Sequence, residues 1–124
     1  MPTLRLAHSP DSDDAFMFYA LAEGKIDTGD RVYVHELADI ESLNRRAASG
    51  DLEVTAVSFH AYASLAATYA LLPHGASIGD GYGPRLVSRR PAPADPRAAL
   101  RDVLVATPGT RTTAHLALHL YQPA

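Results

Sequence analysis

One segment near the end of the chain combines a glycine turn, an arginine and several hydroxyl groups. Residues 107–113 read Thr-Pro-Gly-Thr-Arg-Thr-Thr, with the turn at Gly109, and lead from a strand-like run into a helical one. Free N–H groups at a helix start attract anions, and the hydroxyls of Thr112 and Thr113 add donors. The Arg111 guanidinium has the geometry that binds a carboxylate through two hydrogen bonds. The segment indicates either an anion site or an ordinary threonine-capped helix.

Two further polar residues stand among apolar ones. Ser58 follows the apolar run 54–57, and its bulky neighbours exclude the Gly-x-Ser-x-Gly elbow of a serine hydrolase. A ligand hydrogen bond or a helix cap therefore suits Ser58 better than a nucleophilic role. Asn44 shares the apolar side of a predicted helix with Ile40 and Ala47. An amide in that position is either a satisfied buried group or a pocket contact.

The acidic segment 9–14, Ser-Pro-Asp-Ser-Asp-Asp, holds carboxylates of the kind that bind Ca²⁺ or Mg²⁺. It lacks the glycine and the distal glutamate of an EF-hand loop, which favours helix capping by Ser12 or Asp13 over metal binding. The sequence contains no cysteine, which excludes disulfides and thiolate metal sites. We therefore expect no bound metal.

Four of the six histidines fall into two groups. His8 and His60 lie close to predicted strand ends, where acid–base chemistry would be well placed. His115 and His119 share one face of a predicted helix. Leu116 occupies the position where the zinc-protease pattern needs a glutamate, so surface or packing roles are favoured for this second pair.

The composition is that of an ordinary folded domain. The chain has 124 residues, of which 47% are hydrophobic and 20% charged, and a formal net charge of −3. No basic stripe indicates a nucleic-acid partner. The N-terminus has no apolar signal-peptide core, and no run reaches the roughly 20 apolar residues of a membrane span. We expect a cytoplasmic protein without nucleic-acid or membrane partners.

Strand and helix signals alternate along the chain, which predicts an α/β fold with a largely parallel sheet. In such sheets ligands bind beyond the carboxyl ends of the strands, a rule that selects residues 9–14, Ser58 and residues 107–113 as one crevice. The predicted strands lie at 3–7, 31–37, 54–57, 71–72, 85–88 and 103–106. The predicted helices lie at 15–22, at 40–49 between Asp39 and Gly50, at 59–69 and at 111–121.

Two segments interrupt this alternation. The glycine-rich segment 79–84 lacks the spacing of a dinucleotide fingerprint or a P-loop, and is either a turn or a pocket-lining loop. Pro91, Pro93 and Pro96 form a stiff, exposed link. The link divides the chain into residues 1–88, 89–96 and 97–124.

Five blocks, in order, carry a family resemblance. They are residues 6–21 (LAHSPDSDDAFMFYAL), 40–45 (IESLNR), 57–63 (VSFHAYA), 78–84 (IGDGYGP) and 108–114 (PGTRTTA). Together they resemble the 1,4-dihydroxy-6-naphthoate synthases. The resemblance implies a type 2 periplasmic-binding-protein-like fold, with residues 1–88 as the first lobe and residues from 97 as the start of the second. Asp11 and Asp13 depart from the commoner residues of the first block, so no direct role is assigned to them.

The resemblance also implies a reaction. The family releases 1,4-dihydroxy-6-naphthoate from cyclic dehypoxanthinyl futalosine on the route to menaquinone, as a lyase without metal or organic cofactor. The histidine base of the family is expected beyond residue 124, so no catalytic residue is assigned here, and the 124-residue chain alone is expected to be inactive. The predicted substrate-binding residues are Asn44, Ser58, Thr112 and Thr113 by resemblance, with Ser9, Gly109 and Arg111 added from the strand-end argument.

Two other functions are compatible with such a fold. A solute-binding protein would bind a small carboxylate without turnover, and chorismate dehydratase acts in the same pathway. The lack of signal-peptide features favours an enzyme over a receptor. The expected partner is a small-molecule carboxylate.

Overall fold

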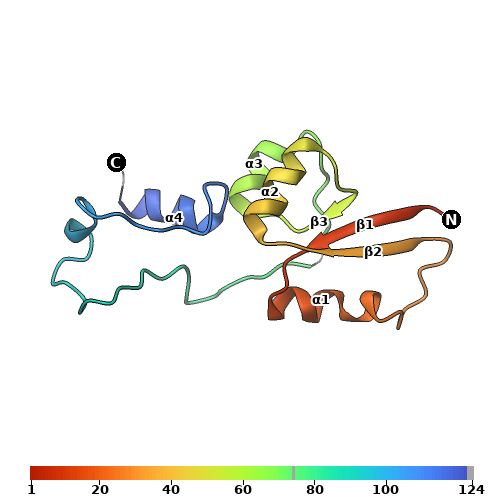
Figure 1. The fold of residues 1–124 in the computed structure, drawn as a ribbon, viewed down its shortest axis with the longest axis horizontal. Helices are drawn as coiled ribbons and strands as arrows, with labels where there is room; N and C mark the ends of the chain where they lie inside the picture. The colour runs from red at the N-terminus through yellow and green to blue at the C-terminus, as the bar shows by residue number, and fades with distance from the viewer. Residues whose placement is uncertain (74, 123–124) are drawn as a thin grey trace.

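Three short parallel strands form a sheet in the N-terminal half of the chain (Figure 1). β1 (Thr3–His8) is central, with β2 (Val32–Leu37) on one side and β3 (Val54–Thr55) on the other. β1 pairs with β2 along its whole length, whereas only Leu6 and Ala7 pair with β3. This computed structural model describes residues 1–73 and 75–122. The predicted α/β class and parallel sheet are confirmed.

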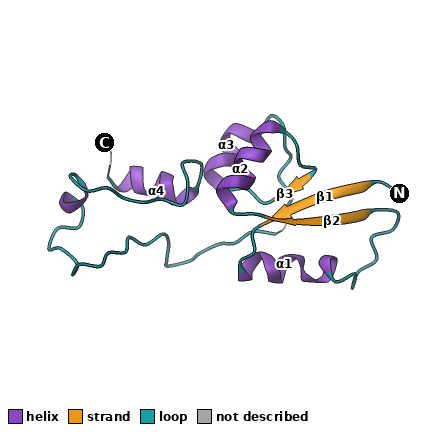
Figure 2. Cartoon of the chain, in the orientation of Figure 1, coloured by secondary structure: helices purple, strands orange, loops and turns teal. Residues whose placement is uncertain are grey.

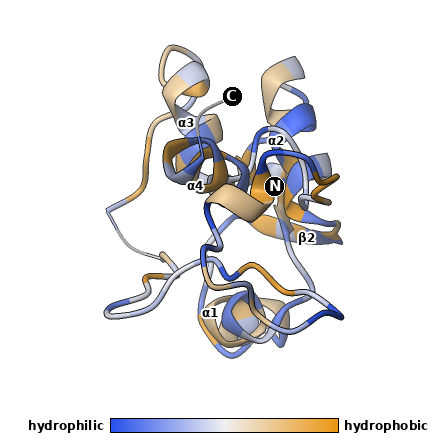
Figure 3. Cartoon of the chain, turned by 90° about the vertical axis from the view of Figure 1, so that its left-hand side faces the viewer, coloured by the Kyte–Doolittle hydropathy of each residue, from blue (hydrophilic) through white to orange (hydrophobic). Residues whose placement is uncertain are grey.

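Helices cover both faces of the sheet (Figure 2). α1 (Ser12–Ala22) lies on one face, while α2 (Ile40–Ser49) and α3 (Phe59–Leu65) lie on the other. An end-on view shows the same separation, with α1 on one side of β2 and the other helices opposite (Figure 3). β2 and β3 each follow a helix that crosses from the preceding strand, the usual connection between parallel strands.

Aspartates set the starts of the first two helices. Asp11 caps α1, with its carboxylate accepting an N–H group of the first turn. The cap therefore lies before the predicted candidates Ser12 and Asp13, because Asp11 is the last residue in extended conformation. Asp39 caps α2 and Gly50 ends it in the left-handed conformation, with φ of 68°, both as predicted.

The core is small and is built around α2. One cluster joins the sheet to α2, and a second joins α2 to α3. Complete burial of a leucine side chain contributes about 1.5–3 kcal/mol, so a few such residues stabilise this unit. The clusters consist of Ala7, Leu43 and Leu52, and of Ala47, Ala61 and Leu65.

The region after α3 differs from the prediction. Between α3 and the end of the described chain, the only regular elements are η1 (Ala98–Leu100) and α4 (Thr113–Tyr121). The predicted strands at 71–72, 85–88 and 103–106 are not formed there. A strand needs a neighbour to satisfy its backbone groups, and an apolar run cannot supply one by itself.

Three predicted elements are shorter in the structure. The strand predicted at 54–57 is reduced to Val54–Thr55, because only this part reaches β1. α3 ends at Leu65 rather than at Tyr69. Tyr69 follows in a turn, and its hydroxyl donates to the Leu52 carbonyl oxygen at 2.8 Å. The helix predicted from Arg111 begins two residues later, since Thr112 provides its cap.

Candidate functional site

Asn44 joins three segments of the chain at the buried side of α2. It is 0% exposed. Its side-chain oxygen accepts the Ser58 N–H at 2.9 Å, and its amide nitrogen donates to Ser58 Oγ at 3.1 Å and to the Arg111 carbonyl oxygen at 3.3 Å. These bonds use both amide donors. Asn44 is thus a satisfied buried group, one of the two roles that its position suggested.

Glu41 lies one helical turn before Asn44 and binds the same loop. Its carboxylate accepts the Arg111 N–H at 3.0 Å, the Thr110 hydroxyl at 3.4 Å and the Arg45 Nε–H at 3.1 Å. Burial alone would raise the pKa of this carboxyl group, but the hydrogen bonds outweigh it and the pKa is lowered. Glu41 is therefore charged at neutral pH.

Glu41 was not among the predicted site residues. An acidic residue in the first turn of a helix is ordinarily explained by the helix dipole, so its type carried no special signal. Its spacing of three from Asn44 does place the two side chains on neighbouring positions of one helix face. That spacing was the only sequence signal that pointed to Glu41.

The start of α4 lies against the start of α3. His60 Nδ1 is 3.2 Å from the Thr112 carbonyl oxygen, and the His60 N–H is 3.5 Å from Thr113 Oγ1. A carbonyl only accepts, so Nδ1 carries the proton and His60 Nε2 is left as an acceptor. The Thr112 hydroxyl donates to the Gly109 carbonyl at 2.8 Å and accepts the His115 N–H at 3.3 Å, which caps α4.

A shallow depression opens beside these contacts. Its lining includes the polar residues His60, Ser64 and Arg111. Within residues 1–73 and 75–122 the Arg111 guanidinium forms no ion pair. The free donors of this cation suit a carboxylate ligand, whereas the Ser64 hydroxyl already donates to the Ala61 carbonyl oxygen at 2.9 Å. The complete lining is His60, Ala61, Ala63, Ser64, Thr110 and Arg111.

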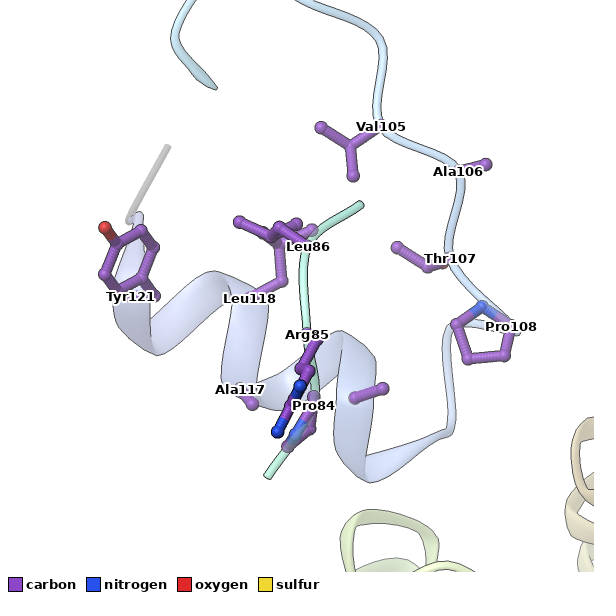
Figure 4. A pocket seen from close by; sticks show the side chains of 11 residues that line it. Pro84, Arg85, Leu86, Val105, Ala106, Thr107, Pro108, Ala117, Leu118 and Tyr121 are labelled. Atoms are coloured by element: carbon purple, nitrogen blue, oxygen red, sulfur yellow. The ribbon is translucent and has the colours of Figure 1, made fainter. Parts of the chain in front are cut away.

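A second cavity, of about 350 Å³, lies between α4 and two extended segments, 84–86 and 105–108 (Figure 4). Leu86, Val105 and Leu118 point toward one another there. Arg85 is the only charged residue in its lining. The cavity is therefore a gap in apolar packing and offers little chemistry.

Ser9 lies apart from the Asn44–Arg111 group. Its N–H donates to Asp14 Oδ2 at 2.7 Å, and its hydroxyl donates to the Asp11 carboxylate. These contacts belong to the start of α1, and in the described residues no hydrogen bond links Ser9 to the group around Asn44. The acidic segment serves in helix capping, as favoured. No cluster of three potential metal ligands occurs in the part of the chain that the structure describes.

A histidine pair joins β1 to β2. His8 Nδ1 lies 2.9 Å from the Ser9 carbonyl oxygen, and His8 Nε2 lies 3.2 Å from His35 Nδ1. The carbonyl accepts, so His8 carries its proton on Nδ1 and accepts the His35 Nδ1–H. His35 Nε2 is buried and has no partner among the described residues. Burial, and then the nearby His8, lower the pKa of His35.

Known proteins resemble the chain along nearly its whole length. The sequence profile of a family described as menaquinone biosynthesis matches residues 4–124. The chain belongs to the menaquinone biosynthesis family. This membership confirms the resemblance predicted from the five sequence blocks.

Two relatives of the chain are named 1,4-dihydroxy-6-naphthoate synthase. The Thermus thermophilus protein is 40% identical over 121 residues, which are 98% of this chain and 42% of the relative. The Streptomyces coelicolor protein is 40% identical over 119 residues, which are 96% of this chain and 40% of the relative. The chain thus spans about two fifths of the length of these relatives.

A solved structure resembles about two thirds of the chain. A protein of Archaeoglobus fulgidus, known from an X-ray crystal structure, superimposes with a TM-score of 0.62 and 56% sequence identity, covering 65% of this chain and 30% of that one. Among the described residues, no helix is long and apolar enough to cross a membrane.

Proposed function

We propose that the chain contributes substrate-binding residues to a 1,4-dihydroxy-6-naphthoate synthase, which converts cyclic dehypoxanthinyl futalosine to 1,4-dihydroxy-6-naphthoate as a lyase. The observation that carries the proposal is the match of 98% of the chain to the Thermus thermophilus synthase. Family membership supports it independently. We assign binding, not proton transfer, to the residues of this chain, and no metal or organic cofactor to the reaction.

Three groups are proposed to bind the substrate carboxylate. Arg111 lines the depression, and its guanidinium is free of ion pairs within the described ranges. The Thr113 side chain is exposed, and its oxygen accepts from His60, which leaves its O–H to donate. Ser58 Oγ accepts from Asn44, so its O–H is likewise available to a ligand.

Three of the other predicted binding residues, Asn44, Thr112 and Gly109, are proposed to hold this arrangement together, whereas Ser9 lies apart from it. Asn44 and Thr112 are buried with their polar atoms engaged. Ser9 belongs to the cap of α1. Gly109 provides a backbone without a side chain at the point where the loop meets α2.

We further propose that residues 1–88 and 97–124 belong to two lobes of a type 2 periplasmic-binding-protein-like fold in a cytoplasmic enzyme. Two features support this division: the regular elements of the first part end with α3, and the second part begins again after the proline-rich link 89–96. A cleft between lobes would place Ser58 on one wall and Thr113 on the other.

The test is an assay of the protein expressed from its complete coding sequence. Cyclic dehypoxanthinyl futalosine and chorismate are supplied in separate reactions, and the products are separated by chromatography. Release of 1,4-dihydroxy-6-naphthoate from the first substrate, without dehydration of chorismate, is the expected result. Dehydration of chorismate alone, or binding of the futalosine compound without turnover, would contradict the proposal.

A further inference from the structure

Arg111 is held by its backbone rather than by its side chain. Its N–H donates to the Glu41 carboxylate at 3.0 Å, and its carbonyl accepts the Asn44 amide at 3.3 Å. Both partners project from one face of α2, and both are buried, at 7% and 0% exposed. Two ordered side chains therefore fix the backbone of one residue on both sides of its Cα atom.

The ion pair of Glu41 also indicates that Arg111 is held by its backbone. Two arginines approach this carboxylate, and Arg45 supplies the guanidinium, with Nε at 3.1 Å from Oε1. Arg111 contributes only its N–H. Arg45 thus compensates the charge of Glu41, and Arg111 lines the depression together with His60 and Ser64 without an ion pair in the described ranges.

Gly109 allows the loop to come this close. A Cβ atom at this position would overlap the carboxylate of Glu41. The φ angle of 147° is also one that residues with side chains rarely adopt. The loop thus fits against α2 in one closely defined position.

We infer that Glu41 is a positioning residue for the loop 109–113, clamping the Arg111 backbone so that the Arg111 guanidinium meets a ligand carboxylate in the depression. The ligand part of this inference rests on the proposed function, whereas the clamp itself does not. A clamp requires that the carboxylate reach the Arg111 N–H. Negative charge alone at the start of α2 would not hold the Arg111 backbone in place.

Two variants separate the effect of the length of the Glu41 side chain from the effect of its charge. Glu41→Asp keeps the charge but shortens the side chain by one methylene, and Glu41→Gln keeps the length and an acceptor oxygen but removes the charge. The readout is amide hydrogen exchange at Arg111, measured by NMR on the 124-residue chain. We expect exchange about 10-fold to 100-fold faster in Glu41→Asp, the range expected for a lost hydrogen bond to a charged group. Glu41→Gln should accelerate it less.

Glu53 provides a matched control. It also accepts a backbone N–H, that of Arg5 at 2.9 Å, together with an arginine side chain, but at the exposed edge of the sheet. Glu53→Asp should accelerate exchange at Arg5 and leave Arg111 unchanged. Unchanged exchange at Arg111 in Glu41→Asp would overturn the inference. So would an equal loss of protection at Ala7 and Leu43, because that would indicate general destabilisation.

A ligand titration tests the second part of the inference, that the Arg111 guanidinium meets a ligand carboxylate. Cyclic dehypoxanthinyl futalosine is titrated into the protein expressed from its complete coding sequence, as wild type, Glu41→Asp, Arg111→Gln and the double variant. We expect each single variant to weaken binding and the double variant to be no weaker than Arg111→Gln, because both changes act through one guanidinium. Additive effects would overturn the positioning role. Absence of binding by the wild type, with the exchange results as expected, would refute the proposed function and the ligand half, and leave the clamp established.

Discussion

The backbone of Gly109 packs against the carboxylate of Glu41 with no space for a side chain between them. The two residues lie in segments far apart in sequence, so this contact fixes how the loop before α4 meets α2. It also explains why a glycine is needed at this place in the turn: both the local φ angle and the neighbouring carboxylate exclude a Cβ atom.

Gly109→Ala is therefore expected to destabilise the loop through two separable effects. Unfavourable backbone conformations cost about 1–3 kcal/mol, and the overlap with Glu41 adds to this. In the double variant with Glu41→Ala the overlap disappears, so part of the loss should be recovered. Urea unfolding followed by circular dichroism measures each free energy of unfolding.

Gly50→Ala is the control for Gly109→Ala. Its φ of 68° is also unfavourable for alanine, but no atom lies within 4 Å of the position that the new Cβ would take. Adding Glu41→Ala to Gly50→Ala should recover none of the lost free energy of unfolding. If Glu41→Ala changes the stability of Gly109→Ala and of Gly50→Ala by the same amount, the contact with Glu41 is not the reason that residue 109 is a glycine.

Removal of the Asn44 amide should be costly. Asn44→Ala leaves the Ser58 N–H and the Arg111 carbonyl without their partner, and each buried polar group left unsatisfied costs about 1–3 kcal/mol. We expect the free energy of unfolding in urea to fall accordingly. Ser49→Ala on the exposed side of the same helix should change it by less than about 0.5 kcal/mol. A loss in Asn44→Ala as small as that of Ser49→Ala would contradict the network.

The two threonines at the start of α4 should respond differently to substitution. Thr112→Val removes the helix cap and should cost about 0.5–2 kcal/mol of stability, whereas Thr112→Ser should retain it. Thr113 is exposed, so Thr113→Val should leave stability nearly unchanged while weakening the binding of cyclic dehypoxanthinyl futalosine. Calorimetry provides both quantities. Unaltered affinity for cyclic dehypoxanthinyl futalosine in Thr113→Val would remove this residue from the proposed site.

Acid should destabilise the fold through His35. Burial, and then the neighbouring His8, lower the pKa of His35 below its ordinary value of 6.5. The unfolded chain then binds a proton at a pH where the folded chain does not, so stability is lost as the pH falls from about 6.5 toward the folded pKa. His35→Gln should reduce the slope of the urea midpoint against pH in this range. The exposed His119→Gln should not, and equal slopes in all three proteins would exclude this origin.

Local signals allowed the elements around α2 to be predicted. Asp39 and Gly50 mark the ends of this helix by capping chemistry that needs no distant partner, and β1 shows a simple alternation. The strands expected at 85–88 and 103–106 failed because strand formation depends on a neighbour that a local pattern cannot reveal.

The candidate site was also predictable only in part, because local signals identify residues but not their distant partners. Asn44, Ser58 and Arg111 were predicted, and the structure brings them into hydrogen-bond contact. The role of Glu41 depends on a partner 70 positions along the chain, and the spacing of Glu41 and Asn44 within α2 places the two on one face without indicating that partner. Ser9 was selected by the strand-end rule, which identifies an edge of a sheet but not which residues on it converge.

The two extended segments that flank α4 should be the least protected parts of the chain. Within the described ranges, no backbone–backbone hydrogen bond involves residues 85–88 or 103–106. Val87 and Leu104 are almost completely exposed, at 92% and 101%. Backbone amides without partners exchange rapidly, so these segments should lose protection well before β1.

Limited trypsin digestion provides an independent measurement of the same property. Cleavage after Arg85 and Arg97 should precede cleavage after Arg46, which lies in α2 and pairs with Glu36 and Asp51 at 2.9 and 3.2 Å. The experiment is done on material shown to be monomeric by sedimentation, because association through exposed apolar side chains would protect the same segments. Slow amide exchange at Val87 in such a monomer, together with early cleavage after Arg46, would show that the extended segments pair and that the stability lies in the C-terminal part instead.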